Sequence, residues 1–436
     1  MDDGRRTLEP GELAARDRTC VWHPYTQHRT EATPLEVVGA RGSLLRLADG
    51  REIVDGISSW WTCLHGHGHP RLVEALAAQA RELDHVIFAG ATHEPGVRLA
   101  EQLTAIAPGP LTRVFFSDNG SSAVEIALKM AFQHHLQRGE SERRVFVTLE
   151  GGYHGDTFGA MSVGDPDPFF EPFRPLLFDV RRVPADADAI EAALEDLGPR
   201  AAGVLMEPLV QGAGGMAMHG AELVRSARAS ATRHGVPLIA DEVMTGFGRT
   251  GELFACAKAG VEPDLLCLAK GLTGGMMPLA VTLAREELFE SFLSDTRARA
   301  FFHGHSFTGH ALGCAVALAS LEVVRDEGTP AKLERIGAAI EARLIDALPE
   351  EIERPRRTGG IVAFDLPVTS GASGYLSELG PLLRQVAIDR GVLLRPLGNV
   401  VYALPPASLS DDEVEGVVGA LVASAESALG SSRRST

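Results

Sequence analysis

The sequence has few of the features that mark secreted or membrane-spanning proteins. Its 436 residues include only five cysteines, and no two of them form a C-x-x-C pair. A disulfide framework is therefore excluded, and we expect reduced thiols in a cytoplasmic protein. No apolar run approaches the ~18 residues that cross a bilayer, and the N-terminal residues MDDGRRTLEPGELAARDRT lack the apolar core of an export signal.

Positive charge is also in short supply. Lysine and arginine number 41 against 58 aspartates and glutamates, which gives a net charge of −17. Such a chain repels phosphate backbones and anionic lipid headgroups, so a small-molecule partner is favoured over nucleic acid or a membrane. Hydrophobic residues, in contrast, make up 45% of the sequence, which is enough for a large folded core.

The pattern of apolar runs predicts an α/β protein. Between residues 66 and 320, short runs such as VPLIAD and DLLCLAK alternate with longer amphipathic stretches, which indicates βα units around a mostly parallel central sheet. The ends of the chain read differently, with a hairpin pattern in LRLADGREIVDG and strand patterns in GGIVAFDLP and VVYALPP. We therefore expect a large domain over 66–320 and a smaller α+β domain built from both termini, residues 1–65 and 321–436.

Three polar positions follow predicted strands of the large domain. Asp241 closes VPLIAD, Lys270 closes DLLCLAK, and the segment SDNGSSAVE joins a strand to a helix. Taken singly, they read as a turn cap, a surface lysine and an ordinary helix cap. Because parallel strands place their carboxyl ends at one edge of a sheet, where α/β proteins bind ligands, the three together predict a site for pyridoxal 5′-phosphate.

Each of these positions matches one part of that cofactor. Gly120 and Ser121 begin a helix whose N–H groups can hold a phosphate dianion. Asp241 would keep the pyridine nitrogen protonated, which makes the ring an electron sink. Lys270, desolvated in a pocket, could form an imine with the aldehyde and later move a proton. Lys129 and Lys258 lie in a helix pattern and a polar stretch, so neither follows a buried strand.

Two glycine-rich loops add candidates for cofactor binding. Tyr153, in GGYHGDTFG, offers an aromatic face for stacking on the cofactor ring, or alternatively closes a small satellite core. Ser306, in FFHGHSFTGH, offers a hydroxyl group.

Two other motifs are rejected. His65, His67 and His69 in LHGHGHP resemble a metal tract, but no cysteine or carboxylate set completes it, so we assign no metal. The run GAGGMA at 212–217 fits a dinucleotide fingerprint but does not lead into a helix.

The cofactor block resembles one known family. DEVMTGFGRTG (241–251) and PDLLCLAKGLTGGMMPL (263–279) place an aspartate, a lysine and flanking glycines as in the class III, fold-type I, PLP-dependent aminotransferases, and the similarity runs from about residue 20 to 406. The segments WHPYTQ, DGISSWWTCLHGHGHP and HVIFAGATHEP are similar to members of that family that act on 8-amino-7-oxononanoate.

The resemblance implies roles for further residues. Lys270, Asp241, Gly120, Ser121 and Tyr153 would hold the cofactor as described above. Asp156 would orient Tyr153 and Tyr25, and Arg395 would clamp a substrate carboxylate. The remaining implied positions would shape the substrate pocket: Tyr25, Trp60 and Trp61 as its walls and Tyr402 at the donor site. The simpler alternatives are core packing for the tryptophans and an ordinary surface charge for Arg395.

The resemblance also implies an activity and an assembly. The expected reaction is transamination of 8-amino-7-oxononanoate to 7,8-diaminononanoate in biotin biosynthesis, with S-adenosyl-L-methionine as amino donor. The expected assembly is a homodimer with shared active sites, in which Ser306 comes from the neighbouring subunit. The loop HGHSFTGHA differs from the HGPTFMGNP form of that family: Ser306 keeps a hydroxyl group, whereas His305, His310 and Ala311 change the substrate side of the loop. The rival readings are a broad ω-aminotransferase acting on diamines or ω-amino acids and a non-catalytic, PLP-binding regulatory protein.

Overall fold

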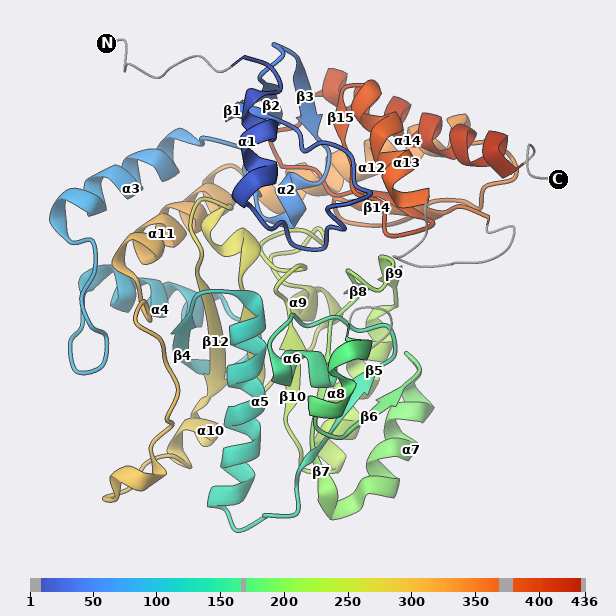
Figure 1. Cartoon of the computed structure of the whole chain (residues 1–436). Helices are drawn as coiled ribbons and strands as arrows, with labels where there is room; N and C mark the ends of the chain where they lie inside the picture. Colours follow the sequence, from blue (N-terminus) through green and yellow to red (C-terminus); the bar gives the residue numbers. More distant parts are fainter. Residues whose placement is uncertain (1–8, 166–169, 368–378, 433–436) are drawn as a thin grey trace.

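The computed structural model describes residues 9–165, 170–367 and 379–432. A seven-stranded sheet forms the centre of the molecule (Figure 1), with the strand order β4-β12-β11-β10-β7-β5-β6. All neighbouring strands are parallel except β12, which runs antiparallel to both β11 and β4. In chain order the strands are β4 (Leu111–Ser117), β5 (Val145–Leu149), β6 (Val180–Val183), β7 (Ala201–Met206), β10 (Leu238–Asp241), β11 (Leu265–Leu268) and β12 (Ala280–Arg285).

Helices cover both faces of this sheet because its strands are apolar on both sides. In β11, Leu265 and Cys267 pack with residues of α5 and α6, whereas Leu266 and Leu268 pack with residues of α4 and α11. Such continuous apolar runs are typical of a buried parallel sheet. The covering helices are α4 (Glu94–Ile106), α5 (Gly120–Gln137), α6 (Phe158–Val163), α7 (Ala187–Leu197), α8 (Ala221–Arg233), α9 (Ala255–Ala259), α10 (Glu286–Glu290) and α11 (Ala311–Asp326), with α3 (Pro70–Glu82) packed on α11.

The two ends of the chain form a second structural region that lies above the central sheet in Figure 1, where they are blue and red. One sheet, of order β1-β2-β3-β15, joins N-terminal strands to a C-terminal one, since β15 pairs in parallel with β3. A second sheet has the order β13-β14-β16. Its strands, β13 (Arg356–Thr358), β14 (Ile361–Asp365) and β16 (Val400–Ala403), accompany β1 (Val37–Arg41), β2 (Leu44–Leu47), β3 (Glu52–Asp55) and β15 (Val392–Leu393).

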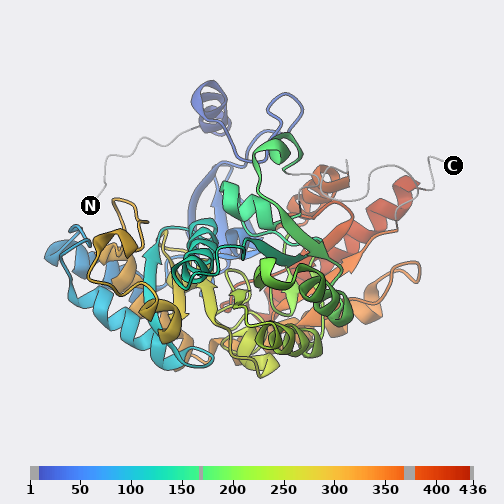
Figure 2. The same cartoon turned by 90° about the horizontal axis from the view of Figure 1, so that it is seen from below.

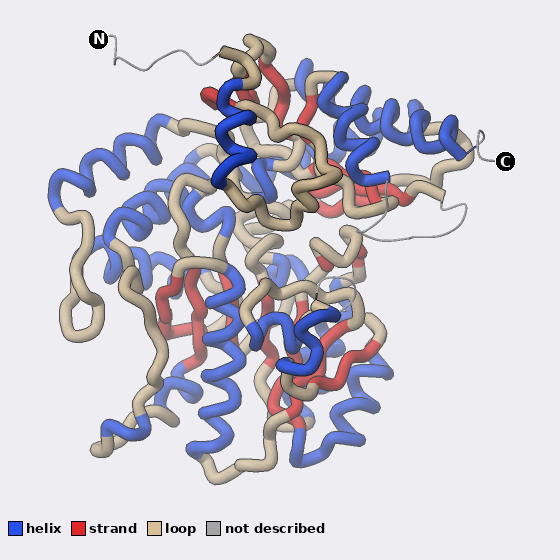
Figure 3. The backbone as a smooth tube through the Cα atoms, in the orientation of Figure 1, coloured by secondary structure: helices blue, strands red, loops and turns tan. Residues whose placement is uncertain are grey.

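Helices also surround these smaller sheets. Figure 2 views the molecule from below, and Figure 3 shows the strands of the two regions as separate groups. The helices of this region are α1 (Glu12–Cys20), α12 (Thr329–Ala347), α13 (Leu379–Asp389) and α14 (Asp411–Ser432). The remaining short elements are α2 (Ser58–Trp61), the hairpin β8 (Val210–Gln211) and β9 (Ala217–Met218), and the 3-10 turns Glu171–Leu176, Gly198–Arg200, Lys270–Thr273 and Arg297–Arg299.

The architecture confirms the predicted α/β class with its mostly parallel central sheet. The hairpin predicted in LRLADGREIVDG is the antiparallel pair β2 and β3, and the two C-terminal strand patterns are β14 and β16, which pair with each other. The reversed strand β12 was not foreseen. Residue 320 lies inside α11, so the division into domains at 320 and 321 stays a prediction. Within the described residues, no helix combines the length and apolar character that crossing a bilayer requires.

Candidate active site

A cavity of about 790 Å³ lies where strands of the central sheet end. Its walls come from both structural regions, because Trp60 and Trp61 of α2 line it together with residues that follow the strands of the central sheet. The predicted site residues that line it are Tyr25, Trp60, Trp61, Gly120, Ser121, Tyr153, Asp156, Asp241 and Lys270. The cavity therefore brings together nine side chains or backbone positions that lie up to 245 residues apart in the sequence.

Asp241 and Lys270 reach this cavity from neighbouring strands. Asp241 is the last residue of β10 and pairs in parallel register with Cys267 of β11, after which Lys270 begins a 3-10 turn. Asp241 is only 4% exposed. Its two carboxylate oxygens accept hydrogen bonds from His154 Nδ1 at 2.7 Å and from the Val243 N–H at 3.0 Å. The carboxylate is thus fixed in position at the base of the cavity.

Lys270 occupies a desolvated position. Its backbone lies in the left-handed region with φ of 42°, and its Nζ lies 4.6 Å from the ring centre of Trp61. Burial lowers the pKa of Lys270 from 10.5 to about 8, although the carboxylates of Asp241 and Glu207 oppose that shift. An amine with this pKa is partly neutral near pH 7 and can act as a nucleophile.

The N-terminus of α5 supplies an anion-binding end to the cavity. Asn119 caps the helix by accepting the Ser122 N–H at 2.9 Å, and the N–H groups of Gly120 and Ser121 belong to the first turn, which has no intrahelical acceptors. A Cβ atom on Gly120 would lie 2.6 Å from the Val243 side chain. Glycine is therefore needed for the helix to approach the strand exits this closely.

A hydrogen-bonded trio links Tyr25, Tyr153 and Asp156. The Tyr25 hydroxyl donates to Asp156 Oδ2 at 2.6 Å, the Tyr153 hydroxyl donates to Asp156 Oδ1 at 3.0 Å, and the two hydroxyl oxygens are 2.9 Å apart. Burial raises the pKa of Tyr153, so its hydroxyl stays protonated. Tyr153 also stacks on Phe170 with ring centres 6.1 Å apart. One carboxylate thus orients both tyrosines at the cavity wall.

Glu207 and His154 also line the cavity, and sequence reasoning missed both. Glu207 follows β7 directly, so the rule that singled out Asp241 could have found it. Its carboxylate accepts the N–H groups of Tyr153 at 3.1 Å and Gly212 at 2.8 Å, and burial raises its pKa to about 7. His154 follows Tyr153 and donates to Asp241. These contacts connect the loop that contains Tyr153 to the carboxyl ends of β7 and β10.

The two tryptophans enter the cavity on a strained turn. The four residues from Ser58 to Trp61 have positive φ angles between 46° and 74°, so α2 is a left-handed turn. Each such residue costs about 1–2 kcal/mol. Trp61 is buried and Trp60 half-buried, and both line the cavity, which combines core packing with a wall position.

Three of the predicted residues do not line the cavity. Tyr402 is 1% exposed and lies behind Trp61, whose Nε1 donates to its hydroxyl at 3.1 Å. The Arg395 guanidinium lies 4.5 Å from the ring centre of Trp60, on a turn after β15. Ser306 is exposed, in a loop where His93 Nε2 contacts the Gly309 carbonyl oxygen at 2.6 Å. Tyr402 and Arg395 thus contact the two tryptophans, which line the cavity.

The rejected motifs have other partners in the structure. His65 contacts Ser320, His67 contacts Asp55 and His69 contacts Glu327, at 2.9–3.0 Å. In the described ranges, no group of three histidine, cysteine or acidic side chains is arranged to hold a metal. GAGGMA spans the connection from β8 to β9.

Comparison with known proteins decides the family. The family model "Aminotransferase class-III" matches residues 25–424. The chain belongs to the class III aminotransferases. As a member of this family, it has the fold-type I architecture and uses pyridoxal 5′-phosphate (PLP) as its cofactor.

Relatives of this aminotransferase match it over nearly its whole length. A protein of Synechococcus elongatus, named adenosylmethionine-8-amino-7-oxononanoate aminotransferase, is 49% identical over 92% of this chain and 97% of its own. The protein of the same name from Mycobacterium leprae is 40% identical over 97% of this chain and 98% of its own. Among solved structures, the enzyme of that name from Methanocaldococcus jannaschii is 33% identical, with a TM-score of 0.90 over 95% of this chain and 98% of that one.

An amine transaminase from an uncultivated Pseudomonas species, solved with PLP bound, is also similar to this aminotransferase. It is 32% identical, with a TM-score of 0.86 over 93% of this chain and 98% of that one. The cavity residues fit the same cofactor: the helix end of α5 suits its phosphate, Asp241 its ring nitrogen and Lys270 its aldehyde. The close approach permitted by Gly120 leaves the helix N–H groups open to the cavity.

Proposed function

We propose that this class III aminotransferase converts 8-amino-7-oxononanoate into 7,8-diaminononanoate in biotin biosynthesis, with S-adenosyl-L-methionine as amino donor. The observation that carries the proposal is the cavity itself, which Asp241 and Lys270 line together with the apolar side chains of Trp60 and Trp61. An apolar wall suits the aliphatic chain of a nine-carbon amino-oxo acid. The names of the relatives that span nearly the whole chain support the same substrate.

When bound, PLP supplies an aldehyde that accepts the amino group and a pyridinium ring that withdraws electrons. Asp241, held by His154, keeps the ring nitrogen protonated. Lys270 would hold the cofactor through its amine and would serve as the group that moves the proton. The N–H groups of Gly120 and Ser121 hold the phosphate.

The substrate side of the cavity orients the chain and excludes water. Tyr153 would pack against the cofactor ring, and Asp156 fixes the hydroxyl groups of Tyr153 and Tyr25. Trp60 and Trp61 shield the aliphatic part of the substrate.

Three residues outside the lining complete the proposal. Arg395 would bind the substrate carboxylate in two-pronged fashion after a small movement of Trp60. Tyr402 would support the donor site by holding the Trp61 indole. Ser306 would contribute its hydroxyl to the phosphate site of a second copy, so we propose a homodimer with shared sites, located in the cytoplasm.

The variant Lys270→Ala tests the proposal. We expect it to lose conversion of 8-amino-7-oxononanoate, followed by mass spectrometry with S-adenosyl-L-methionine as donor, together with the visible absorption of the bound cofactor. Lys332→Ala is the matched control, because Lys332 pairs with Glu327 on the surface at 2.7 Å. Lys270→Ala protein that still turns over and stays yellow would contradict the assigned role.

Similarity to the Pseudomonas amine transaminase favours one second candidate, a broad ω-aminotransferase. Growth rescue of a bacterial strain that lacks the diaminononanoate-forming step separates the two, since only the proposed activity restores growth without biotin. A panel of amines, each followed by bleaching of the cofactor absorption, identifies the donor. Protein that binds PLP but is bleached by none of these amines would instead be the non-catalytic regulator.

A further inference from the structure

The left-handed turn that carries both tryptophans requires support from outside the cavity. Its four residues, Ser58 to Trp61, hold φ angles that L-amino acids avoid because Cβ crowds the backbone carbonyl. Such a conformation persists only where neighbouring groups determine it more strongly than the local backbone does. The contacts that fix this turn therefore also fix Trp60 and Trp61.

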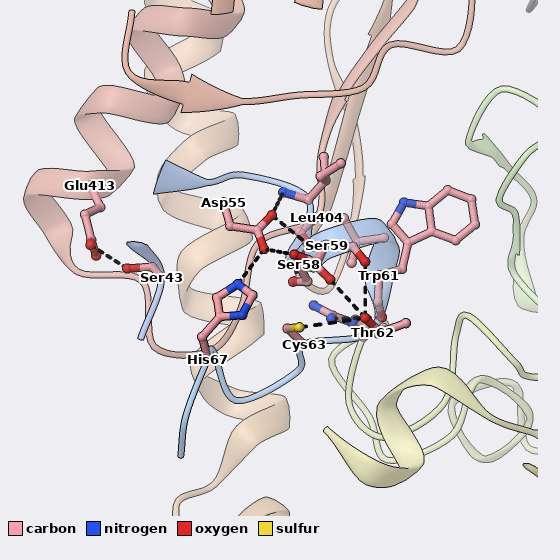
Figure 4. A network of polar contacts seen from close by, with 12 residues as sticks. Ser43, Asp55, Ser58, Ser59, Trp61, Thr62, Cys63, His67, Leu404 and Glu413 are labelled. Atoms are coloured by element: carbon pink, nitrogen blue, oxygen red, sulfur yellow. Dashed lines mark hydrogen bonds and ion pairs between the residues drawn. The ribbon is translucent and has the colours of Figure 1, made fainter. Parts of the chain in front are cut away.

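Asp55, the last residue of β3, makes the densest set of these contacts. Its side chain has no exposed surface. One carboxylate oxygen, Oδ1, accepts the Ser59 N–H at 2.8 Å and the Ile57 N–H at 3.4 Å, and the other, Oδ2, accepts the Ser59 hydroxyl at 2.7 Å (Figure 4). Hydrogen bonds to an ionised acceptor are about twice as strong as neutral ones. One carboxylate thus binds the start of the turn at three points.

His67 holds Asp55 from the other side. Its Nε2 lies 2.9 Å from Asp55 Oδ2 (Figure 4). Hydrogen bonding to Asp55 and, second, to Cys63 raises the pKa of His67 to about 10, so the imidazole stays protonated. A cation beside a buried carboxylate offsets the cost of burying that charge. The backbone of His67 is bonded to Gly42 in both directions, at 2.7 and 2.9 Å, which anchors the pair to the β1–β2 turn.

Other groups hold the first and last residues of the same turn. The Ser58 hydroxyl donates to the Leu404 carbonyl at 2.8 Å, and Arg249 donates to the Trp61 carbonyl at 3.2 Å. Asp55, His67, Leu404 and Arg249 all lie outside the cavity lining, and His67 acts on the turn through Asp55. Their effect on a substrate must therefore pass through the turn, whose residues Ser59, Trp60 and Trp61 line the cavity.

We propose that Asp55, backed by His67, is a positioning residue that holds the left-handed turn so that Trp60 and Trp61 face the substrate. This inference rests on the proposed function for its substrate. The Asp55→Ala variant removes all three contacts with the turn and leaves Asp241, Lys270 and the α5 N-terminus in place. We expect the KM for 8-amino-7-oxononanoate to rise about tenfold or more, with a smaller change in kcat, since misplaced walls weaken orientation. The visible absorption of the bound cofactor should be unchanged.

The tryptophans themselves give a readout that does not depend on activity. The chain has three, and Trp22 is 90% exposed, so a Trp22→Phe background leaves fluorescence from Trp60 and Trp61 alone. In that background we expect Asp55→Ala to increase acrylamide quenching about twofold as the turn relaxes toward solvent. Asp49→Ala is the matched control, because Asp49 carries the same charge in the adjacent β2–β3 turn but pairs only with exposed Arg51.

Folded Asp55→Ala protein with quenching and KM like those of Asp49→Ala would overturn the proposal. If Asp55→Ala does not fold, His67→Gln carries the same test with a smaller expected change, because it leaves the carboxylate in place. Parent protein that is inactive on 8-amino-7-oxononanoate would refute the proposed function alone, since the quenching comparison needs no substrate and still decides whether Asp55 holds the turn.

Discussion

The depressed pKa of Lys270 makes its reaction with aldehydes depend on pH in a way that no other described lysine should share. A pKa of about 8 in place of 10.5 leaves about 9% of the amine neutral at pH 7, against about 0.03% for an ordinary lysine, a ratio of about 300. Because only the neutral amine attacks an aldehyde, cofactor-free protein should capture PLP at Lys270 far faster than at a surface lysine.

The assay follows covalent capture between pH 6 and 9.5. Protein is mixed with limiting PLP, reduced with borohydride at timed intervals, and digested for peptide mass spectrometry. Modification of the Lys270 peptide should rise about tenfold per pH unit below pH 7 and level off above about pH 8, and the Lys332 peptide serves as the surface reference.

A charge substitution checks the physical cause. Burial lowers the pKa of Lys270, and the Glu207 carboxylate opposes that shift by stabilising the ammonium form. Glu207→Gln should therefore move the half-maximum of capture to lower pH. Capture at Lys270 that climbs steeply through pH 9.5, or that cannot be distinguished from capture at Lys332, would refute the argument that desolvation tunes this amine.

Two further predictions concern glycines. Gly120→Ala would place a Cβ atom 2.6 Å from the Val243 side chain. We therefore expect the affinity for PLP, measured by equilibrium dialysis, to fall about tenfold and to recover partly when Val243→Ala is added. An unchanged affinity would contradict the close approach of the helix. Gly337→Ala should destabilise the protein by about 1–3 kcal/mol in denaturant unfolding because its Cβ would overlap the Gly359 carbonyl oxygen. Gly416→Ala, in an open part of α14, should instead stabilise it by up to about 1 kcal/mol, and equal effects at both helical glycines would disprove the packing explanation.

Much of the fold was predictable because its signals are local. The apolar runs that became β7, β10 and β11 are buried on both faces, so they carry no alternation and read directly as strands of a parallel sheet. The reversed direction of β12 was not predictable, because a strand's own residues do not record which neighbour it pairs with. Its direction follows from pairings with β4 and β11, and β4 is more than 160 residues away.

The candidate site divides in the same way. Asp241 and Lys270 could be identified from the sequence because each lies at the carboxyl end of a buried strand. The carboxyl ends of parallel strands lie at one edge of the sheet. Glu207 carries the same signal at the end of β7, yet its role as the acceptor for the Tyr153 and Gly212 N–H groups appears only in three dimensions. The positions of these side chains could thus be predicted from the sequence, but their hydrogen-bond partners could not.

The sequence by itself determined the class of fold, the cofactor and the strand-end residues that line the cavity, because those depend on periodicity and on residue type at strand ends. Only the tertiary structure decided how the substrate wall is held. The Ser58 hydroxyl reaches a carbonyl 346 residues away, and the Trp61 indole reaches Tyr402 across 341 residues. A left-handed turn is unfavourable in isolation, so no local pattern predicts it, and it exists here because distant parts of the chain fold around it.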